Sequence, residues 1–158
     1  MEQKNVLVVD DEQDVLDTLD SMLTQMDFNT FLALDGERAL SIIENQDVDV
    51  VLADIYMPGM DGFELLKNVR AIDKNTVCLM ITGRPTIETA VASIREGAYD
   101  YITKPFDFDD LRIKINRCIE KKKLSHSLRW ANGVIWALIF SIPFWLILGI
   151  ILASILGD

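Results

Sequence analysis

The sequence predicts a doubly wound α/β fold, in which a five-stranded parallel sheet carries helices on both faces. Short apolar runs alternate five times with stretches whose apolar residues recur at helical spacing, which is the pattern of successive βα units. The runs have few polar residues, as expected for strands buried on both faces. The chain has 158 residues, half of them apolar, which suffices for one domain with its own core.

The five units follow one another without a long break. The strands are expected at residues 6–9, 31–34, 48–53, 77–81 and 99–103, and the helices that follow them around residues 15–23, 39–43, 63–69, 87–94 and 111–119. Three acidic residues, Asp107, Asp109 and Asp110, precede the apolar positions of the last helix. Negative charge is favourable at a helix N-terminus, so this helix should begin there. A C-terminal apolar helix is expected after these five units.

Charge divides the chain into three parts. Residues 1–110 contain 8 basic and 23 acidic side chains, residues 111–129 contain 7 basic and 1 acidic, and Asp158 is the only charged residue after them. The net charge is −10. Nucleic-acid binding needs clustered Lys and Arg, so an acidic body argues against a nucleic-acid partner.

The two cysteines, Cys78 and Cys118, lie far apart in the sequence and have no metal-binding spacing. They are expected to be reduced, partly buried thiols of a cytosolic domain. The N-terminal segment is acidic and has no long apolar core, so no secretory signal is expected.

Polar residues stand where four of the apolar runs stop: Asp10 and Asp11, Asp54, Thr82, and Lys104. In a parallel sheet these positions meet at one edge, where ligands bind. Three converging carboxylates would repel one another without a cation, and Mg²⁺ is the divalent ion that suits carboxylate, water and phosphate oxygens. A carboxylate nucleophile with a metal, an ammonium and a hydroxyl forms a site for phosphoryl transfer.

Four segments carry a resemblance to a known family: VLVVDDE, VLADIYMPGMDGFELL, MITG and GAYDYITKPF. They resemble the receiver domain of two-component response regulators over roughly residues 4–123. The resemblance implies that Asp54 accepts a phosphoryl group from a histidine kinase or a phosphotransfer protein. It implies that Asp10, Asp11, Asp54 and the backbone carbonyl of Tyr56 hold Mg²⁺.

The resemblance also assigns roles around the phosphoryl group. Lys104 would pair with it, and the bond from Lys104 to Pro105 would be cis. Thr82 would bond a phosphoryl oxygen and draw its loop inward, and Tyr101 would be the aromatic switch that follows. The resemblance places Tyr56 and Arg84 at positions that tune the lifetime of the phosphoryl group in the family, and the alternative is that both are ordinary solvated side chains. Beyond Mg²⁺-dependent self-phosphorylation and self-dephosphorylation, no enzymatic activity is expected.

The C-terminal part predicts a membrane anchor. Residues 134–156 contain no charged side chain, and a helix of that length spans the hydrocarbon core of a bilayer. Residues 124–133 would form a basic juxtamembrane linker. The Lys and Arg residues before the apolar segment place the receiver on the cytoplasmic face of the membrane. Pro143 leaves open a kinked span or a re-entrant hairpin, and small residues at four-residue spacing suggest a homodimer.

The first function hypothesis is a membrane-anchored single-domain response regulator that signals by protein contact, since no DNA-binding or ATPase module is expected after residue 124. Phosphorylation would act on the surface around residues 86–101. The alternatives are a phosphate sink without output, a scaffold in which the receiver has lost its activity, and an aspartate-nucleophile phosphatase of small molecules. The phosphatase pattern needs a second Asp two residues after the nucleophile, where this chain has Tyr56.

Overall fold

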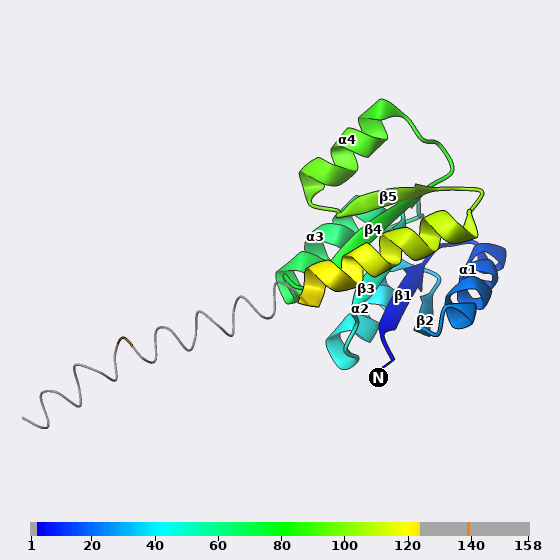
Figure 1. The fold of residues 1–158 in the computed structure, drawn as a ribbon. Coiled ribbons are helices and arrows are strands. Elements are labelled where there is room, and N and C mark those ends of the chain that lie inside the picture. Colours follow the sequence, from blue (N-terminus) through cyan, green and yellow to red (C-terminus); the bar gives the residue numbers. More distant parts are fainter. Residues whose placement is uncertain (1–2, 124–138, 140–158) are drawn as a thin grey trace, which may run out of the picture. The chain divides into compact units, whose positions relative to one another are not determined.

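The structure, a computed structural model, describes residues 3–123 and residue 139. Strands and helices alternate from the first strand onward (Figure 1). In chain order they are β1 (Asn5–Val9), α1 (Gln13–Gln25), β2 (Asn29–Ala33), α2 (Gly36–Asn45), β3 (Val50–Asp54), α3 (Gly62–Ile72), β4 (Val77–Thr82), α4 (Ile87–Glu96) and β5 (Asp100–Thr103). A further helix covers residues 108–123 and is called the 108–123 helix below.

The sheet confirms the predicted fold class. Its five strands are all parallel and lie in the order β2-β1-β3-β4-β5. In this order the chain changes direction across the sheet between β1 and β3, and the carboxyl ends of these two strands border a crevice where ligands bind in open α/β sheets. All five predicted strands are present, and the differences concern only their ends.

Two strands begin two residues away from the predicted position, each for an identifiable reason. β2 begins at Asn29 rather than Phe31 because this edge strand continues its pairing with β1 down to the Asn5–Asn29 pair. Asn29 and Thr30 are polar, so the apolar pattern could not show that the strand begins there. β3 begins at Val50 rather than Val48, since the carbonyl of Val48 accepts hydrogen bonds from the side chains of Lys122 (3.0 Å) and Thr76 (3.4 Å) instead of from a neighbouring strand.

The sheet separates two apolar cores, as the continuous apolar runs predicted. Side chains of α1 and the 108–123 helix pack on one face, among them Leu19 and Leu111. Those of α2 and α3 pack on the other, among them Ala39 and Leu65. Both layers can be followed in Figure 1. The strands contribute alternate residues to the two cores.

Side-chain caps begin most of the helices. Asp35 accepts from the Arg38 amide at the start of α2, and Asp61 accepts from the Glu64 amide at the start of α3, both at 2.8 Å. Thr86 and Thr89 form a reciprocal capping box on α4. Asp107 accepts from the Asp110 amide (2.8 Å) at the start of the 108–123 helix, as its acidic residues suggested. The exception is α1, where the Glu12 side chain makes no capping hydrogen bond.

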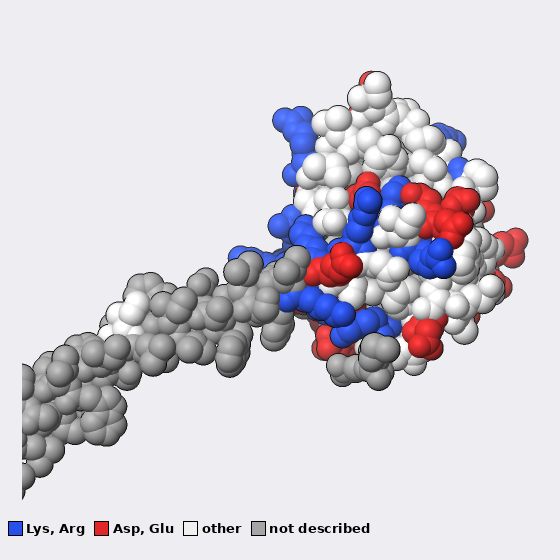
Figure 2. Space-filling model, viewed as in Figure 1, with Lys and Arg blue, Asp and Glu red and all other residues white. Residues whose placement is uncertain are grey.

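The basic residues of the 108–123 helix are partly neutralised by acids (Figure 2). Arg112 pairs with Asp109 at 2.8 Å, and Lys114 pairs with Asp110 at 3.0 Å. Within the described residues, no helix is both long and apolar enough to span a bilayer. The predicted linker at 124–133 and the predicted apolar helix at 134–156 lie outside the described residues, apart from residue 139.

Candidate functional site

The structure brings all five predicted polar residues to the carboxyl edge of the sheet. Asp10 and Lys104 directly follow β1 and β5, and Asp54 and Thr82 are the last residues of β3 and β4. Asp10, Asp54 and Thr82 are buried, with 0%, 6% and 1% of their surface exposed, whereas Asp11 is exposed. This edge of the sheet therefore has three buried polar side chains beside the exposed carboxylate of Asp11.

Three carboxylates form the centre of the site. One carboxylate oxygen from each of Asp10, Asp11 and Asp54 can be chosen so that all three lie within 4.8 Å of one another. Asp10 is held in place because its Oδ1 accepts from the Glu12 amide at 3.0 Å. Like charges at such separations raise each other's energy, so the group favours a cation or a proton.

Lys104 supplies a positive charge to this cluster. Its Nζ lies 2.7 Å from Asp10 Oδ2, 3.6 Å from Glu12 Oε1 and 3.8 Å from Asp54 Oδ2. Burial lowers the pKa of Lys104, but its contacts with Asp10 and the other two carboxylates outweigh burial and raise it. The side chain therefore stays protonated as an ammonium that faces the cluster.

Asp54 carries the clearest electrostatic signature of the site. Burial raises the pKa of its carboxyl, and the neighbouring Asp10 and Asp11 add to this effect against the opposing charge of Lys104, giving a pKa of about 6. Strongly perturbed carboxyls in a cleft are typical of functional sites.

Gly62 fixes the backbone beneath Asp54. The Gly62 amide donates to the carbonyl of Ile55 at 3.0 Å, and a Cβ at position 62 would lie 2.2 Å from the Asp54 carbonyl oxygen. Only glycine allows the start of α3 to approach β3 this closely. The loop between them thereby holds the end of β3 in a fixed position.

Thr82 links the site to the loop before α4. Its Oγ1 accepts from the Arg84 amide at 3.0 Å, so the hydroxyl proton is available for another acceptor. Tyr101 is half-buried against the α2–α3 core, and its carbonyl accepts from Lys114 Nζ at 2.8 Å. The Lys104–Pro105 bond is cis, as the resemblance implies.

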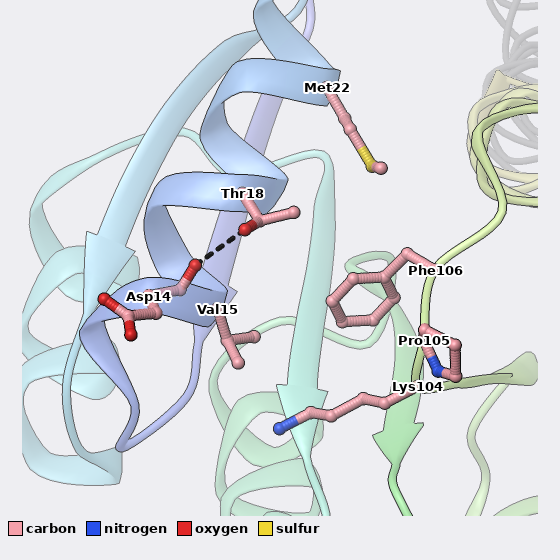
Figure 3. A pocket seen from close by; sticks show the side chains of 7 residues that line it. All are labelled: Asp14, Val15, Thr18, Met22, Lys104, Pro105 and Phe106. Carbon is pink, nitrogen blue, oxygen red and sulfur yellow. Dashed lines mark hydrogen bonds between the residues drawn. The ribbon is translucent and has the colours of Figure 1, made fainter.

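Two of the hollows at this edge of the sheet are bordered by Lys104. A cavity of about 340 Å³ is lined by Asp11, Glu12, Asp54, Tyr56, Gly83, Arg84 and Lys104. A second groove of about 360 Å³, called the α1 groove here, runs between α1 and the segment after β5 (Figure 3). Figure 3 shows Val15 and Met22 on one side and Phe106 on the other, with Lys104 extending along its floor. Lys104 thus borders both hollows.

Comparison with known proteins decides the family. The sequence model described as "Response regulator receiver domain" matches residues 6–116. The chain belongs to this family. Receiver domains bind Mg²⁺ at an acidic pocket and interact with histidine kinases or phosphotransfer proteins, and this receiver has the corresponding cluster of Asp residues.

Individual relatives agree with this assignment. The chain is 37% identical over 124 residues to the regulatory protein AtoC of Escherichia coli, which covers 78% of this chain and 27% of that protein. It is 39% identical over 122 residues to a response regulator of Rickettsia bellii described as NtrX-like, covering 76% of this chain and 26% of that protein. The chain therefore spans about a quarter of the length of these relatives.

Solved structures show the same architecture. A CheY-like receiver domain protein of Methanospirillum hungatei has a TM-score of 0.74 at 31% identity, covering 78% of this chain and 99% of that one. NtrX of Brucella abortus has a TM-score of 0.76 at 36% identity, covering 80% of this chain and 29% of that one.

Sequence reasoning missed one residue of this receiver's site. Glu12 contacts Lys104 and lines the cavity at Asp54, whereas the sequence pattern assigns it no role. A signal was available, because Glu is not among the residues preferred at a helix N-cap. A Glu at that position suggests another use for its side chain.

Proposed function

We propose that this receiver accepts a phosphoryl group on Asp54 from a histidine kinase or a phosphotransfer protein. The observation that carries the proposal is the convergence of three carboxylates within 4.8 Å of one another, with the Lys104 ammonium 3.8 Å from Asp54. In the transfer, an Asp54 oxygen forms a bond to phosphorus while the bond from phosphorus to the donor's histidine nitrogen breaks. That nitrogen keeps the electron pair. Positioning and charge neutralisation provide most of the catalysis in such reactions.

The donor set fits Mg²⁺. The carboxylates of Asp10, Asp11 and Asp54 and the backbone carbonyl of Tyr56 would hold it, and oxygen ligands are those that Mg²⁺ prefers. Asp10 Oδ2 is buried and has no hydrogen bond of good geometry, although the Lys104 ammonium lies 2.7 Å away as an ion pair. This oxygen can therefore face a second cation. When bound, Mg²⁺ neutralises negative charge on the transferring phosphoryl group.

Thr82 and Lys104 would contact the oxygens of the phosphoryl group on Asp54. Lys104 pairs with the phosphoryl oxygens. The Thr82 hydroxyl donates a hydrogen bond to one of them, since it acts only as an acceptor toward the Arg84 amide. A shift of Thr82 toward the phosphoryl group draws Arg84 along, because the two share that hydrogen bond. Tyr101 then turns inward as the switch residue, which biases the α4–β5 surface toward a second conformation.

The output of this receiver would be a protein contact on α4. Ile87, Val91 and Ile94 are spaced along one face of α4 and have 80%, 50% and 52% of their surface exposed. A row of exposed large apolar residues is typical of an interaction site. A phosphate sink without output is the alternative, and it predicts that charged substitutions on this face leave signalling unchanged.

The test of phosphorylation uses acetyl phosphate with Mg²⁺ on the full chain and on Asp54→Asn. The expected result is a mass increase of one phosphoryl group, present in the full chain and absent in the variant. No labelling would overturn the proposal. Steady release of phosphate far beyond one equivalent would indicate the small-molecule phosphatase instead. We propose no enzymatic activity beyond self-phosphorylation and self-dephosphorylation.

We further propose that residues 134–156 anchor this receiver in the cytoplasmic membrane, with the receiver on the cytoplasmic face. The support is the sequence: the segment has no charged side chain and follows a run of Lys and Arg, as the positive-inside rule requires. The test fractionates cells that express the full chain or a version ending at Lys123, followed by an alkaline carbonate wash. Retention of only the full chain is expected, and release of both contradicts the anchor.

A further inference from the structure

Glu12 is the N-cap residue of α1, but its side chain makes no capping hydrogen bond. In α2, α3 and α4 the side chain of the N-cap residue accepts a hydrogen bond from a backbone amide; these residues are Asp35, Asp61 and Thr86. The Glu12 side chain makes no such bond. Its Oε1 lies 3.6 Å from the Lys104 ammonium instead. The side chain is therefore oriented toward the phosphorylation pocket.

Lys104 has three carboxylate neighbours, and they do not all have the same role. Asp10 and Asp54 belong to the carboxylate group suited to a metal, and Glu12 lies outside that group. Glu12 lines the cavity at Asp54 together with Lys104. Its influence on the site is therefore exerted through Lys104.

We propose that Glu12 is a positioning residue that competes with the phosphoryl group for Lys104. The inference rests on the proposed function. In the unphosphorylated receiver, Lys104 is held between Asp10 at 2.7 Å and Glu12 at 3.6 Å, and Asp54 is the most distant of the three at 3.8 Å. To neutralise charge on the transferring phosphoryl group, Lys104 has to move toward Asp54 and away from Glu12. Glu12 thereby slows phosphorylation.

The size of the effect follows from exposure. The Glu12 side chain is 67% exposed, so solvent screens its attraction to Lys104, and exposed pairs are worth at most about 1 kcal/mol. Removing the competition should therefore raise the phosphorylation rate about two- to five-fold. The effect requires the Glu12 carboxylate to extend as far as Lys104. Shortening the side chain in Glu12→Asp should therefore accelerate phosphorylation as Glu12→Gln does.

The experiment compares Glu12→Gln, Glu12→Asp and the control Glu37→Gln in the full chain. Glu37 is an exposed acid in the first turn of α2, so its substitution makes the same charge change away from Lys104. With acetyl phosphate and saturating Mg²⁺, both Glu12 variants are expected to label faster and Glu37→Gln to match the unaltered chain. If Glu12→Asp labels at the unaltered rate, charge alone matters and the proposal is overturned.

A double-mutant cycle tests whether the effect passes through Lys104. In a Lys104→Met background, Glu12→Gln should leave the labelling rate unchanged, and a persisting acceleration would overturn the proposal. A second measurement needs no phosphorylation: the ¹³Cε resonance of Lys104 should shift in Glu12→Gln and stay in place in Glu37→Gln. An unmoved resonance in Glu12→Gln also overturns it. Failure of the unaltered chain to label would instead refute the proposed function.

Discussion

The Lys122 ammonium lies 3.0 Å from Asp49 Oδ1 and joins the 108–123 helix to the segment just before β3. Lys122 also donates to the Val48 carbonyl at 3.0 Å. Burial raises the pKa of Asp49, but the Asn5 amide and Lys122 outweigh it and hold the pKa below its usual value. This contact lies at the amino end of the sheet, opposite the phosphorylation pocket.

Substituting Lys122 by Met should destabilise the fold by about 2 kcal/mol at pH 7, because a largely buried carboxylate loses a partner. Since the folded pKa of Asp49 is depressed, its stabilising contribution exists above the unfolded pKa of 3.8 and disappears as the pH falls below it. The loss caused by Lys122→Met should therefore shrink in acid. Urea unfolding at several pH values measures this difference in unfolding free energy, and Lys123→Met, at an exposed position, is the control. Equal effects of both variants would contradict this account.

Asp54→Asn should stabilise the metal-free protein at neutral pH. The folded pKa of about 6 exceeds the ordinary 3.8, so between these values the native state binds more protons than the unfolded state, and stability falls as the pH rises. Well above pH 6 the ionised Asp54 destabilises the fold by about 3 kcal/mol, and the neutral Asn removes this cost. Thermal unfolding in a chelator at pH 4 and pH 7.5 measures this. A variant no more stable than the unaltered chain at pH 7.5 would refute the assignment.

Magnesium should raise the thermal stability of the unaltered chain. At ten times its dissociation constant, a ligand that binds only the native state contributes about 1.4 kcal/mol. Asp11→Asn should remove most of this gain without unfolding the protein, because Asp11 is exposed. Melting curves with and without MgCl₂ provide the measurement. A stabilisation that persists in Asp11→Asn would place the metal elsewhere.

Gly62→Ala should destabilise the fold by about 2–4 kcal/mol. The new Cβ would lie 2.2 Å from the Asp54 carbonyl oxygen and 2.9 Å from Ile55 Cα, and these backbone atoms cannot move without shifting the end of β3. Phosphorylation of Asp54 should slow for the same reason. Gly83→Ala is the stability control, since its Cβ would meet only Lys104 Cδ at 3.9 Å. Equal unfolding free energies for the two variants would contradict this prediction, because they would show that the end of β3 can shift at little cost to accommodate the new Cβ.

The two cysteines should resist thiol reagents in the native state. Burial raises the pKa values of Cys78 and Cys118 to about 12 each, and only the thiolate is reactive. A chromogenic disulfide reagent at pH 8 should detect no reaction of these thiols until denaturant is added. Rapid native labelling of either cysteine would indicate that its core opens locally.

The sequence predicted the fold and the main site residues because parallel strands end at one edge of a sheet. Asp10, Asp54, Thr82 and Lys104 stand where apolar runs stop, and the geometry of a parallel sheet then brings them together. The contacts of Glu12 and Lys122 are of another kind. Each depends on a long side chain that reaches a residue distant in the sequence, and hydropathy or periodicity contains no information on such contacts.

The separation of the two edges of the sheet bears on how this receiver can evolve or be engineered. The predicted metal ligands, Thr82 and Lys104 lie at or beside the carboxyl edge, whereas the turn over residues 26–28, where Asp27 has a φ of 66°, lies at the amino edge. Insertions in surface turns are tolerated when they leave buried backbone in place. Asp27 is exposed, whereas Met26 and Phe28 pack against the core. A reporter, a purification tag or a new recognition loop inserted at Asp27 should therefore leave the phosphorylation chemistry intact, provided that Met26 and Phe28 keep their packing.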